Sequence, residues 1–390
     1  MANLIHDFDW ELSSNSTPGT IVMTGEGRDN VPKAHSTESN TQKTIHESMT
    51  IAKKSNCERC QQSTYDHHQR FISIFPMHDK EVLEAPDGGN KQREEQPMYA
   101  VVTGSYRGVG FGIVKLLASE GITVVLTSRD EKRGLERMEK LKEEEDSTLS
   151  QNIVLHQLDV TDPASISSLA DFIKSKFGKL DILVNNACCG GVRIVGNPSP
   201  FPNESPDPMY VDWSKIIETY ELAEECIDTN YYGAKRMVEA LIPLLQLSDS
   251  PRIVNVSSIG GMLQYMTNTW ALEIFGDVEN LTEERVEDVL RVFLKDFENG
   301  LPKINGWPVR PSAAKISKTA LNAYTRILAN KYPTNFCINC VCPGPVKTDR
   351  SFYPLKRTIE EGAQGPVKLA LLPNGGPSGL FFTEKGLSTF

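Results

Sequence analysis

The stretch Thr103-Gly104-Ser105-Tyr106-Arg107-Gly108-Val109-Gly110 indicates the fold of this chain. It follows the apolar run Tyr99–Val102, which predicts a buried strand, and precedes residues 112–119, whose apolar residues have helical spacing. Glycines between a first strand and a first helix let the backbone approach a diphosphate, whose charge then lies at the helix N-terminus. The stretch therefore predicts a dinucleotide-binding turn. The alternative is a tight strand–helix turn that binds no ligand.

Apolar runs and amphipathic segments alternate through the rest of the chain. Strands are predicted at 122–126, 153–158, 180–184, 252–256 and 336–341, and helices at 131–144, 165–177 and 317–330. This alternation is typical of a parallel sheet with helices on both faces. We therefore predict an α/β fold, a Rossmann-type doubly wound parallel sheet at 98–390. A helical insertion is expected at about 262–310, where Thr282 would cap a helix that runs to Asn299.

Residues 1–97 have a different composition, rich in Ser, Thr, Asn, Gln, His and charged residues. Such a segment buries too little apolar surface to offset the entropy of ordering it, so we predict a disordered N-terminal tail. Cys57, Cys60, His67 and His68 are potential zinc ligands within this tail. Their spacing is shorter than in common zinc modules, so we interpret them as ordinary residues of a flexible segment and predict no metal site.

The composition argues against several classes of partner and enzyme. The 390 residues carry a net charge of −10, which disfavours nucleic acid because phosphate neutralisation needs clustered Lys and Arg. No apolar run reaches the ~20 residues of a membrane helix, and the N-terminus has no signal or transit pattern. We therefore expect no membrane partner and a cytoplasmic location. Among seven histidines, His156 is the one within 98–390, which argues against a Ser–His hydrolase.

The end of the second predicted strand bears on the choice of cofactor. Arg129 stands at its tip and Asp130 follows one place later. A carboxylate at the tip would accept a hydrogen bond from a ribose 2′-hydroxyl, whereas an arginine offers a planar donor fork to a 2′-phosphate. Arg107 in the glycine stretch adds a second positive charge. The pattern favours NADPH over NADH; the alternative is two exposed basic residues without a ligand.

Several motifs, taken in order, resemble those of the short-chain dehydrogenase/reductase family. They are Thr103-Gly104-x-x-x-Gly108-x-Gly110, Asp159-Val160, Asn185-Asn186-Ala187, Asn255-Val256-Ser257-Ser258 and Pro343-Gly344. The resemblance covers residues 98–390. Four further stretches are similar to the plant group that contains salutaridine reductase and the menthone or neomenthol reductases. These stretches are 220–230, 241–258, 283–306 and 321–330.

The resemblance implies a set of cofactor-binding residues. Asp159 would hold the adenine amino group, and Val160 would line the adenine site. Asn186 would lie along a cofactor ribose, and Thr348 would hold the nicotinamide carboxamide. The full predicted NADP(H) site consists of Gly104, Arg107, Gly108, Val109, Gly110, Arg129, Asp159, Val160, Asn186, Lys318 and Thr348.

The resemblance also implies catalytic residues. Ser258 would hydrogen-bond the substrate carbonyl, and Asn230 would hold a water in a proton relay. Lys318 would bind the nicotinamide ribose and lower the pKa of a tyrosine four residues earlier. These roles make physical sense, because hydride delivery to a ketone develops negative charge on oxygen, which needs a hydrogen-bond donor and a proton source.

Position 314, where the tyrosine is expected, is alanine. A methyl group donates no proton, and general acids usually contribute ~10²–10⁴-fold, so we expect strongly reduced carbonyl reduction. Lys318 with a water, or Tyr265, are the two conceivable replacements. A second departure is Cys188, where the family has glycine; Cys188 and Cys189 are interpreted as free thiols.

We predict an NADP-dependent oxidoreductase that reduces ketone groups on plant secondary metabolites, alkaloids or terpenoids, with an activity that Ala314 is expected to reduce. The alternatives are a catalytically silent NADP-binding scaffold and a non-redox isomerase or cyclase on the same fold. The expected partner is a small ketone or alcohol. In the resembling reductases the insertion covers the helix face used elsewhere for oligomers, which implies a monomer. Trp270, Phe275 and Trp307 are expected either to line an apolar pocket or to pack within the insertion.

Overall fold

The computed structural model describes residues 96–144, 147–195, 213–348 and 357–390. The predicted tail, including Cys57, Cys60, His67 and His68, lies outside the described residues. In chain order the elements are β1 (Tyr99–Val102), α3 (Gly108–Ser119), β2 (Thr123–Ser128), α4 (Glu131–Glu144), α5 (Ser147–Gln151), β3 (Ile153–Gln157), α6 (Pro163–Phe177), β4 (Ile182–Asn185), β5 (Arg193–Ile194), η3 (Trp213–Lys215), β6 (Ile216–Ile217), α7 (Tyr220–Ile227), η4 (Asp228–Tyr232), α8 (Gly233–Leu245), β7 (Arg252–Val256), η5 (Ile259–Gly261), η6 (Leu263–Tyr265), α9 (Thr269–Gly276), α10 (Glu283–Glu298), α11 (Ser312–Lys331), β8 (Cys337–Val341), α12 (Ile359–Ala370), β9 (Phe381–Thr383) and β10 (Gly386–Ser388).

The main sheet has the strand order β10-β9-β8-β7-β4-β1-β2-β3. Neighbouring strands from β9 to β3 are parallel, and β10 pairs antiparallel with β9 at its edge. The predicted doubly wound Rossmann-type sheet is therefore confirmed. The chain builds outward from β1 to β3 and then returns to β4 on the other side of β1. Such a reversal leaves a crevice at the carboxyl ends of the two central strands, where ligands bind in this fold.

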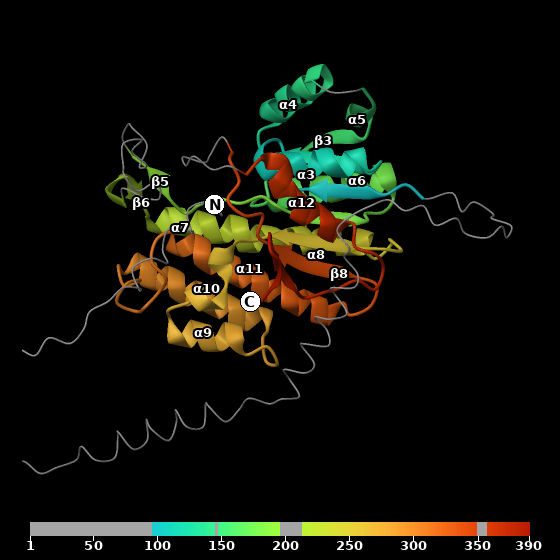
Figure 1. The fold of residues 1–390 in the computed structure, drawn as a ribbon. Helices are drawn as coiled ribbons and strands as arrows, with labels where there is room; N and C mark the ends of the chain where they lie inside the picture. The colour runs from blue at the N-terminus through green and yellow to red at the C-terminus, as the bar shows by residue number, and fades with distance from the viewer. Residues whose placement is uncertain (1–95, 145–146, 196–212, 349–356) are drawn as a thin grey trace, which may run out of the picture. The chain divides into compact units, whose positions relative to one another are not determined.

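Alternating side chains of β1 explain why both faces of the sheet are covered. Ala100 and Val102 lie in a core cluster with residues of α3 and α12, whereas Val101 lies in a second cluster with residues of α6, α8 and α11. All three side chains are fully buried. Because successive residues of a strand point to opposite faces, a run that is apolar throughout requires helices on both sides. Figure 1 shows α3 and α12 on one side of the sheet and α8 and α11 on the other.

The predicted start of α11 was wrong, since the helix begins at Ser312 rather than at 317. The carboxylate of Glu218 accepts hydrogen bonds from the backbone N–H of Ser312 at 2.8 Å and from its hydroxyl at 3.0 Å. This contact caps the first turn from a residue 94 positions earlier. The strands β5 and β6, which lie between β4 and α7 in the chain, were also not predicted. The same is true of α12, β9 and β10, although the capping box of Thr358 and Glu361 marks the start of α12.

The predicted insertion forms α9 and α10, which pack beside α11 (Figure 1). Thr282 caps α10 by accepting a hydrogen bond from the N–H of Arg285, which confirms that prediction. Phe275 and Trp307 are buried in the same core cluster as α10, so they pack the insertion, and Trp270 is 41% exposed. Within the described ranges, no helix is both long enough and apolar enough to cross a membrane.

Candidate active site

Two glycines of the first turn are required by close packing against the loop after β4. A Cβ on Gly104, which has φ of +61°, would lie 2.9 Å from the Cα of Ala187. A Cβ on Gly110 would lie 2.4 Å from Nδ2 of Asn186 and 2.9 Å from the Cα of Ser105. All three distances are shorter than a real Cβ atom allows. Because glycine has no Cβ, these two positions let the two loops of the crevice pack in direct contact. The sequence pattern did not reveal this role of the glycines.

Asn186 and Thr103 fasten the same two loops with hydrogen bonds. Nδ2 of Asn186 donates to the carbonyl oxygens of Thr103 at 2.9 Å and Gly104 at 3.2 Å. The hydroxyl of Thr103 accepts from the backbone N–H groups of Asn186 and Ala187, both at 2.9 Å. The crevice is thus prebuilt. The side-chain amide of Asn186 is engaged in these hydrogen bonds. The predicted contact of this residue with a cofactor ribose stays a prediction.

The N-terminus of α3 has the properties of an anion site. Its N-cap residue, Arg107, makes no side-chain capping hydrogen bond, and the first turn contains no acidic residue. Backbone N–H groups of a first turn lack helical partners and carry partial positive charge. The methyl group of Thr348 lies 3.7 Å from the position of a Cβ on Gly108, so the structure brings Thr348 to this turn. The site therefore fits a dinucleotide diphosphate.

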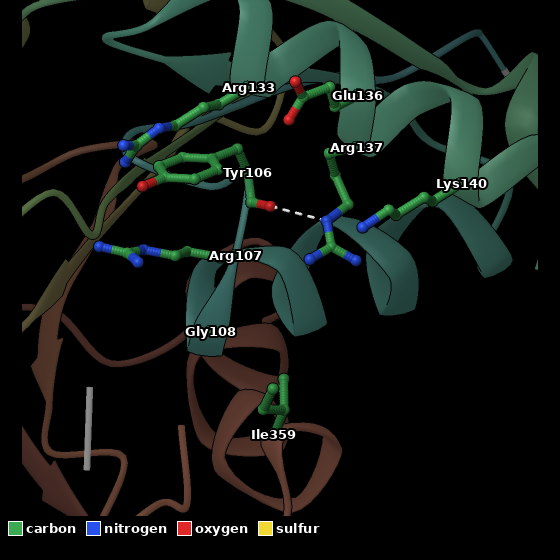
Figure 2. A pocket seen from close by; sticks show the side chains of 8 residues that line it. All are labelled: Tyr106, Arg107, Gly108, Arg133, Glu136, Arg137, Lys140 and Ile359. Atoms are coloured by element: carbon green, nitrogen blue, oxygen red, sulfur yellow. Dashed lines mark hydrogen bonds between the residues drawn. The ribbon is translucent and has the colours of Figure 1, made fainter. Parts of the chain in front are cut away.

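A pocket of about 360 Å³ adjoins this turn (Figure 2). Four basic side chains and one carboxylate are among its lining residues, which are Tyr106, Arg107, Gly108, Arg133, Glu136, Arg137, Lys140 and Ile359. The guanidinium of Arg107 lies 5.1 Å from the ring centre of Tyr106. A side-chain hydrogen bond with Tyr106 raises the pKa of the Arg133 guanidinium. Figure 2 shows the side chains of Arg107, Tyr106 and Arg133 extending in the same direction. The excess of positive charge favours an anionic ligand such as a phosphate.

Arg133, Arg137 and Lys140 were missed by the sequence reasoning. They lie four and three residues apart on α4, a spacing that places side chains on one helix face. Nε of Arg137 donates to the carbonyl oxygen of Tyr106 at 2.9 Å, which fixes the glycine turn against α4. Arg129, predicted as the phosphate contact, is exposed at the end of β2 and is not among the residues that line this pocket.

Asp159 and Val160 follow β3 at the carboxyl edge of the sheet. Oδ1 of Asp159 accepts hydrogen bonds from the backbone N–H of Thr161 at 3.0 Å and from its hydroxyl at 2.7 Å. The side chain of Val160 is 6% exposed and lies against Gly233 at the start of α8. The structure therefore places both residues at the carboxyl end of the edge strand β3, with the Val160 side chain turned into the core, and their predicted contacts with adenine stay predictions.

Ser258 and the ammonium group of Lys318 both lie at the end of β7. Ser258 follows the strand, is 1% exposed, and its Oγ accepts a hydrogen bond from the N–H of Gly260 at 3.2 Å. Lys318 reaches from α11, and its Nζ donates to the carbonyl oxygen of Val256 at 2.7 Å. A Cβ on Gly261 would lie 2.7 Å from the backbone of Lys318, so helix and loop are in direct contact. The tertiary structure thus places the hydroxyl predicted to bind the substrate carbonyl and the ammonium group predicted to bind the nicotinamide ribose at the end of the same strand.

Asn230 lies in η4, a turn of π-helix between α7 and α8. Such turns occur often at functional sites because they redirect a side chain out of the helical register. Its Nδ2 donates to Oγ of Ser317 at 3.0 Å, and that hydroxyl donates to the carbonyl oxygen of Ala314 at 3.0 Å. Asn230 is therefore connected to the turn of α11 that carries Ala314 and Lys318.

Comparisons with known proteins agree with this geometry. A family model described as short chain dehydrogenase matches residues 98–270. (+)-Neomenthol dehydrogenase of Arabidopsis thaliana is 56% identical over 306 residues, which are 76% of this chain and 99% of that protein. The chain belongs to the short-chain dehydrogenase family. Relatives of this chain are named dehydrogenases and reductases, and this chain is an oxidoreductase.

Two further relatives place this short-chain dehydrogenase within its family. The structure of salutaridine reductase from Papaver somniferum is 52% identical, with a TM-score of 0.66, and the match covers 73% of this chain and 99% of that one. Carbonyl reductase 3 of Mus musculus, whose name specifies NADPH, is 34% identical over 75% of this chain and 98% of its own length. The predicted resemblance to the plant group of salutaridine and neomenthol reductases is confirmed.

Side chains on one face of α11 hydrogen-bond to residues in and just after β7, and so hold this short-chain dehydrogenase's site together. The sequence analysis did not identify this set of hydrogen bonds. Beyond Lys318, Asn322 accepts from the hydroxyl of Ser257 at 2.6 Å and donates to the carbonyl oxygen of Gly261 at 3.1 Å. The hydroxyl of Thr325 accepts from Nδ2 of Asn255 at 2.9 Å. Positions 318, 322 and 325 have the spacing of one helix face, which is the signal that a search for polar residues would have found.

Ala314 is fully buried one helical turn before Lys318. Its methyl group has no acidic hydrogen to give, so the described cluster of Ser258, Asn230 and Lys318 lacks a side-chain acid at this position. Tyr265 ends η6 and is half-buried, and it stays an alternative proton donor. Tyr324 is a core residue, 1% exposed and in edge contact with Tyr231, and burial raises the pKa of its hydroxyl.

Proposed function

We propose that this short-chain dehydrogenase reduces a ketone group on a plant secondary metabolite of the alkaloid or terpenoid class. The observation that carries the proposal is the convergence of Ser258 and Lys318 at the end of β7, with Asn230 joined to the same turn of α11. The names of the neomenthol dehydrogenase and salutaridine reductase relatives support this substrate class.

The cofactor is NADP(H). The uncapped N-terminus of α3 accommodates its diphosphate, and the pocket beside it offers Arg107 and Arg133 to the 2′-phosphate. Arginine binds phosphate through two parallel N–H donors, so this pair discriminates against a cofactor with a free 2′-hydroxyl. Bound NADPH supplies a hydride for the carbonyl carbon of the substrate.

The chain's own residues would act on the carbonyl oxygen and on the cofactor ribose. The hydroxyl of Ser258 donates a hydrogen bond to the oxygen as negative charge develops on it. The ammonium of Lys318 binds the ribose and contributes positive charge to the same region. Asn230 holds the α11 turn in place through Ser317. Because Ala314 supplies no proton, protonation of the product depends on water or on another group, and the turnover is expected to be low.

The fully buried methyl group of Ala314 favours a second candidate, an NADP(H)-binding protein that no longer catalyses reduction. In that case the crevice would bind the cofactor and leave ketones unchanged. Both candidates require the same nucleotide site, so only turnover separates them.

The test compares this chain with Ala314→Tyr and Ala314→Phe by NADPH oxidation against a panel of cyclic ketones, with NADPH binding measured in parallel. Phe has the size of Tyr without its hydroxyl, so it controls for packing. We expect Tyr, and not Phe, to raise turnover by ~10²-fold or more. Equal turnover by the unmodified chain and the Tyr variant would show that another proton donor operates. NADPH binding without turnover in all three would support the silent binder.

A further inference from the structure

Two thiols lie together behind the nucleotide crevice. Cys189 is in the loop after β4, and Cys226 is in α7. The Sγ of Cys226 donates a hydrogen bond to the carbonyl oxygen of Cys189 at 3.3 Å. Gly191 closes the same loop against Cys226, because a Cβ on Gly191 would lie 3.1 Å from the Cβ of Cys226. The pair therefore joins two elements that meet only in the tertiary structure.

Asn230 contacts both members of this pair. Its Oδ1 accepts from the backbone N–H of Cys189 at 2.8 Å, while its Nδ2 lies 3.1 Å from the carbonyl oxygen of Cys189 and 3.2 Å from the Sγ of Cys226. A change at the Cys226 sulfur therefore acts directly on Asn230, whereas a change at Cys189 reaches Asn230 through the Cys189 backbone.

The two thiols differ in access and acidity. Cys189 is partly exposed, whereas Cys226 is fully buried. The hydrogen bond from Cys226 lowers the pKa of Cys189 below the ordinary value of a thiol, and burial raises the pKa of Cys226. Oxidants attack thiolates. We therefore expect Cys189 to react first with an oxidant. Cys226, whose sulfur lies 3.3 Å from the carbonyl oxygen of Cys189, is the neighbouring thiol that can then react with the oxidised Cys189.

We propose that Cys189 and Cys226 form a reversible disulfide when the protein meets hydrogen peroxide. The thiolate sulfur of Cys189 attacks one peroxide oxygen, the O–O bond breaks, and Cys189 becomes a sulfenic acid with release of water after proton transfer. The sulfur of Cys226 then attacks the sulfenic sulfur, forming the S–S bond and expelling a second water. Two thiols are oxidised and one peroxide is reduced to two waters.

The disulfide would disturb the nucleotide crevice. Forming it would fix the Cβ atoms at the ~3.5–4.5 Å of a disulfide and would remove the thiol proton that Cys226 donates to the carbonyl oxygen of Cys189. The loop that carries Cys189 also carries Ala187, whose Cα packs on Gly104, and Asn186, whose amide donates to the carbonyl oxygens of Thr103 and Gly104. Oxidation is therefore expected to weaken NADPH binding, a consequence that rests on the proposed function.

The direct test is chemical and does not depend on activity. The full chain is treated with hydrogen peroxide, remaining thiols are alkylated, and peptides are mapped by mass spectrometry. We expect a peptide containing Cys189 joined to one containing Cys226, with the loss of two hydrogens, and its disappearance after dithiothreitol. Cys188→Ser, one residue away, is the matched control and should retain the bond, whereas Cys189→Ser and Cys226→Ser should each abolish it.

Mapping also separates this pair from the other thiols. Cys340 is buried, which raises the pKa of its thiol to about 12, so it should stay reduced. A cross-link found between other cysteines while Cys189 and Cys226 remain alkylatable would overturn the proposal. NADPH titration of the reduced protein is done separately. If the reduced chain does not bind NADPH, the proposed function fails while the disulfide can still form; if it binds equally well before and after cross-linking, the regulatory consequence fails.

Discussion

Nζ of Lys318 donates a hydrogen bond to the carbonyl oxygen of Val256 at 2.7 Å, and both residues are almost fully buried. This bond holds an ammonium group at the end of β7, two residues before Ser258. A charged donor that is removed from water and positioned by a backbone carbonyl needs no reorganisation before it acts on a ligand. The ammonium group that we propose would act with a tyrosine at position 314 is thus held one helical turn beyond the alanine that stands there.

The first prediction concerns the partnership between Lys318 and a restored acid. Tyrosine has an ordinary pKa near 10 and needs a nearby positive charge to act at lower pH. In an Ala314→Tyr background, Lys318→Met should remove most of the gain in turnover and move the tyrosine limb of the pH–rate profile upward. Lys331→Met, on the exposed end of the same helix, is the control. An unchanged pH profile would contradict the role of Lys318.

The second prediction concerns cofactor choice. Arg107→Ala and Arg133→Ala should each raise the Kd for NADPH by about tenfold at low salt, and leave NADH binding nearly unchanged, because each removes a charged donor to the 2′-phosphate. Lys132→Ala changes a neighbouring residue of α4 that does not line the pocket, and serves as the control. Titration with both nucleotides at two salt concentrations measures the effect. Equal losses for NADH and NADPH would place the 2′-phosphate elsewhere.

The third prediction concerns the packing of the glycine turn. Gly110→Ala forces a methyl group into contact with Asn186 and the backbone of Ser105, so it should lower the free energy of unfolding by about 1–3 kcal/mol and abolish cofactor binding. Gly276→Ala adds the same methyl group where no atom lies within 4 Å, and should be tolerated. Urea unfolding and NADPH titration of both variants provide the comparison. Normal binding by Gly110→Ala would show that the two loops separate easily.

The fourth prediction concerns pH and Glu218. Burial raises the pKa of this carboxyl above its ordinary value, against the opposing effects of Ser312 and Arg310. The folded state therefore retains the proton more firmly than the unfolded state. The stabilisation from this group is present below the unfolded pKa, about 4.3, and is lost as pH rises through the folded pKa. Glu218→Gln should flatten that part of the unfolding free-energy curve. A slope unchanged in the variant would contradict the assignment.

The fifth prediction concerns assembly. The insertion helix α10 packs against α7 and α11, and Nζ of Lys235 on α8 lies 2.8 Å from Glu283 and 2.6 Å from Glu287 of α10. These contacts cover helix surface that would otherwise be open to a second copy. We expect a monomer by size-exclusion chromatography with light scattering at micromolar concentration. A stable dimer would show that another surface carries the interface.

The sequence alone predicts the sheet, its first nucleotide turn, the helical insertion and the family, because these depend on short-range signals. Each of these signals is contained within a few neighbouring positions. Examples are the apolar strand run around Val101, the glycines of residues 104–110 and the helix cap at Thr282. The absence of tyrosine at position 314 is equally plain from the sequence. Element boundaries were less accurate, as the early start of α11 shows.

Only the tertiary structure reveals contacts between residues that are distant in sequence. Glu218 caps α11 from 94 positions away, and Cys226 meets Cys189 from 37 positions away. Arg133 and Arg107 line the same pocket because α4 lies beside the glycine turn. No pattern in the sequence connects these two positions. Periodicity tells which side of a strand or helix is buried, but the partner across the interface depends on how whole elements pack. For this reason the nucleotide fold is readable from the chain, whereas the basic pocket and the thiol pair emerge only after folding.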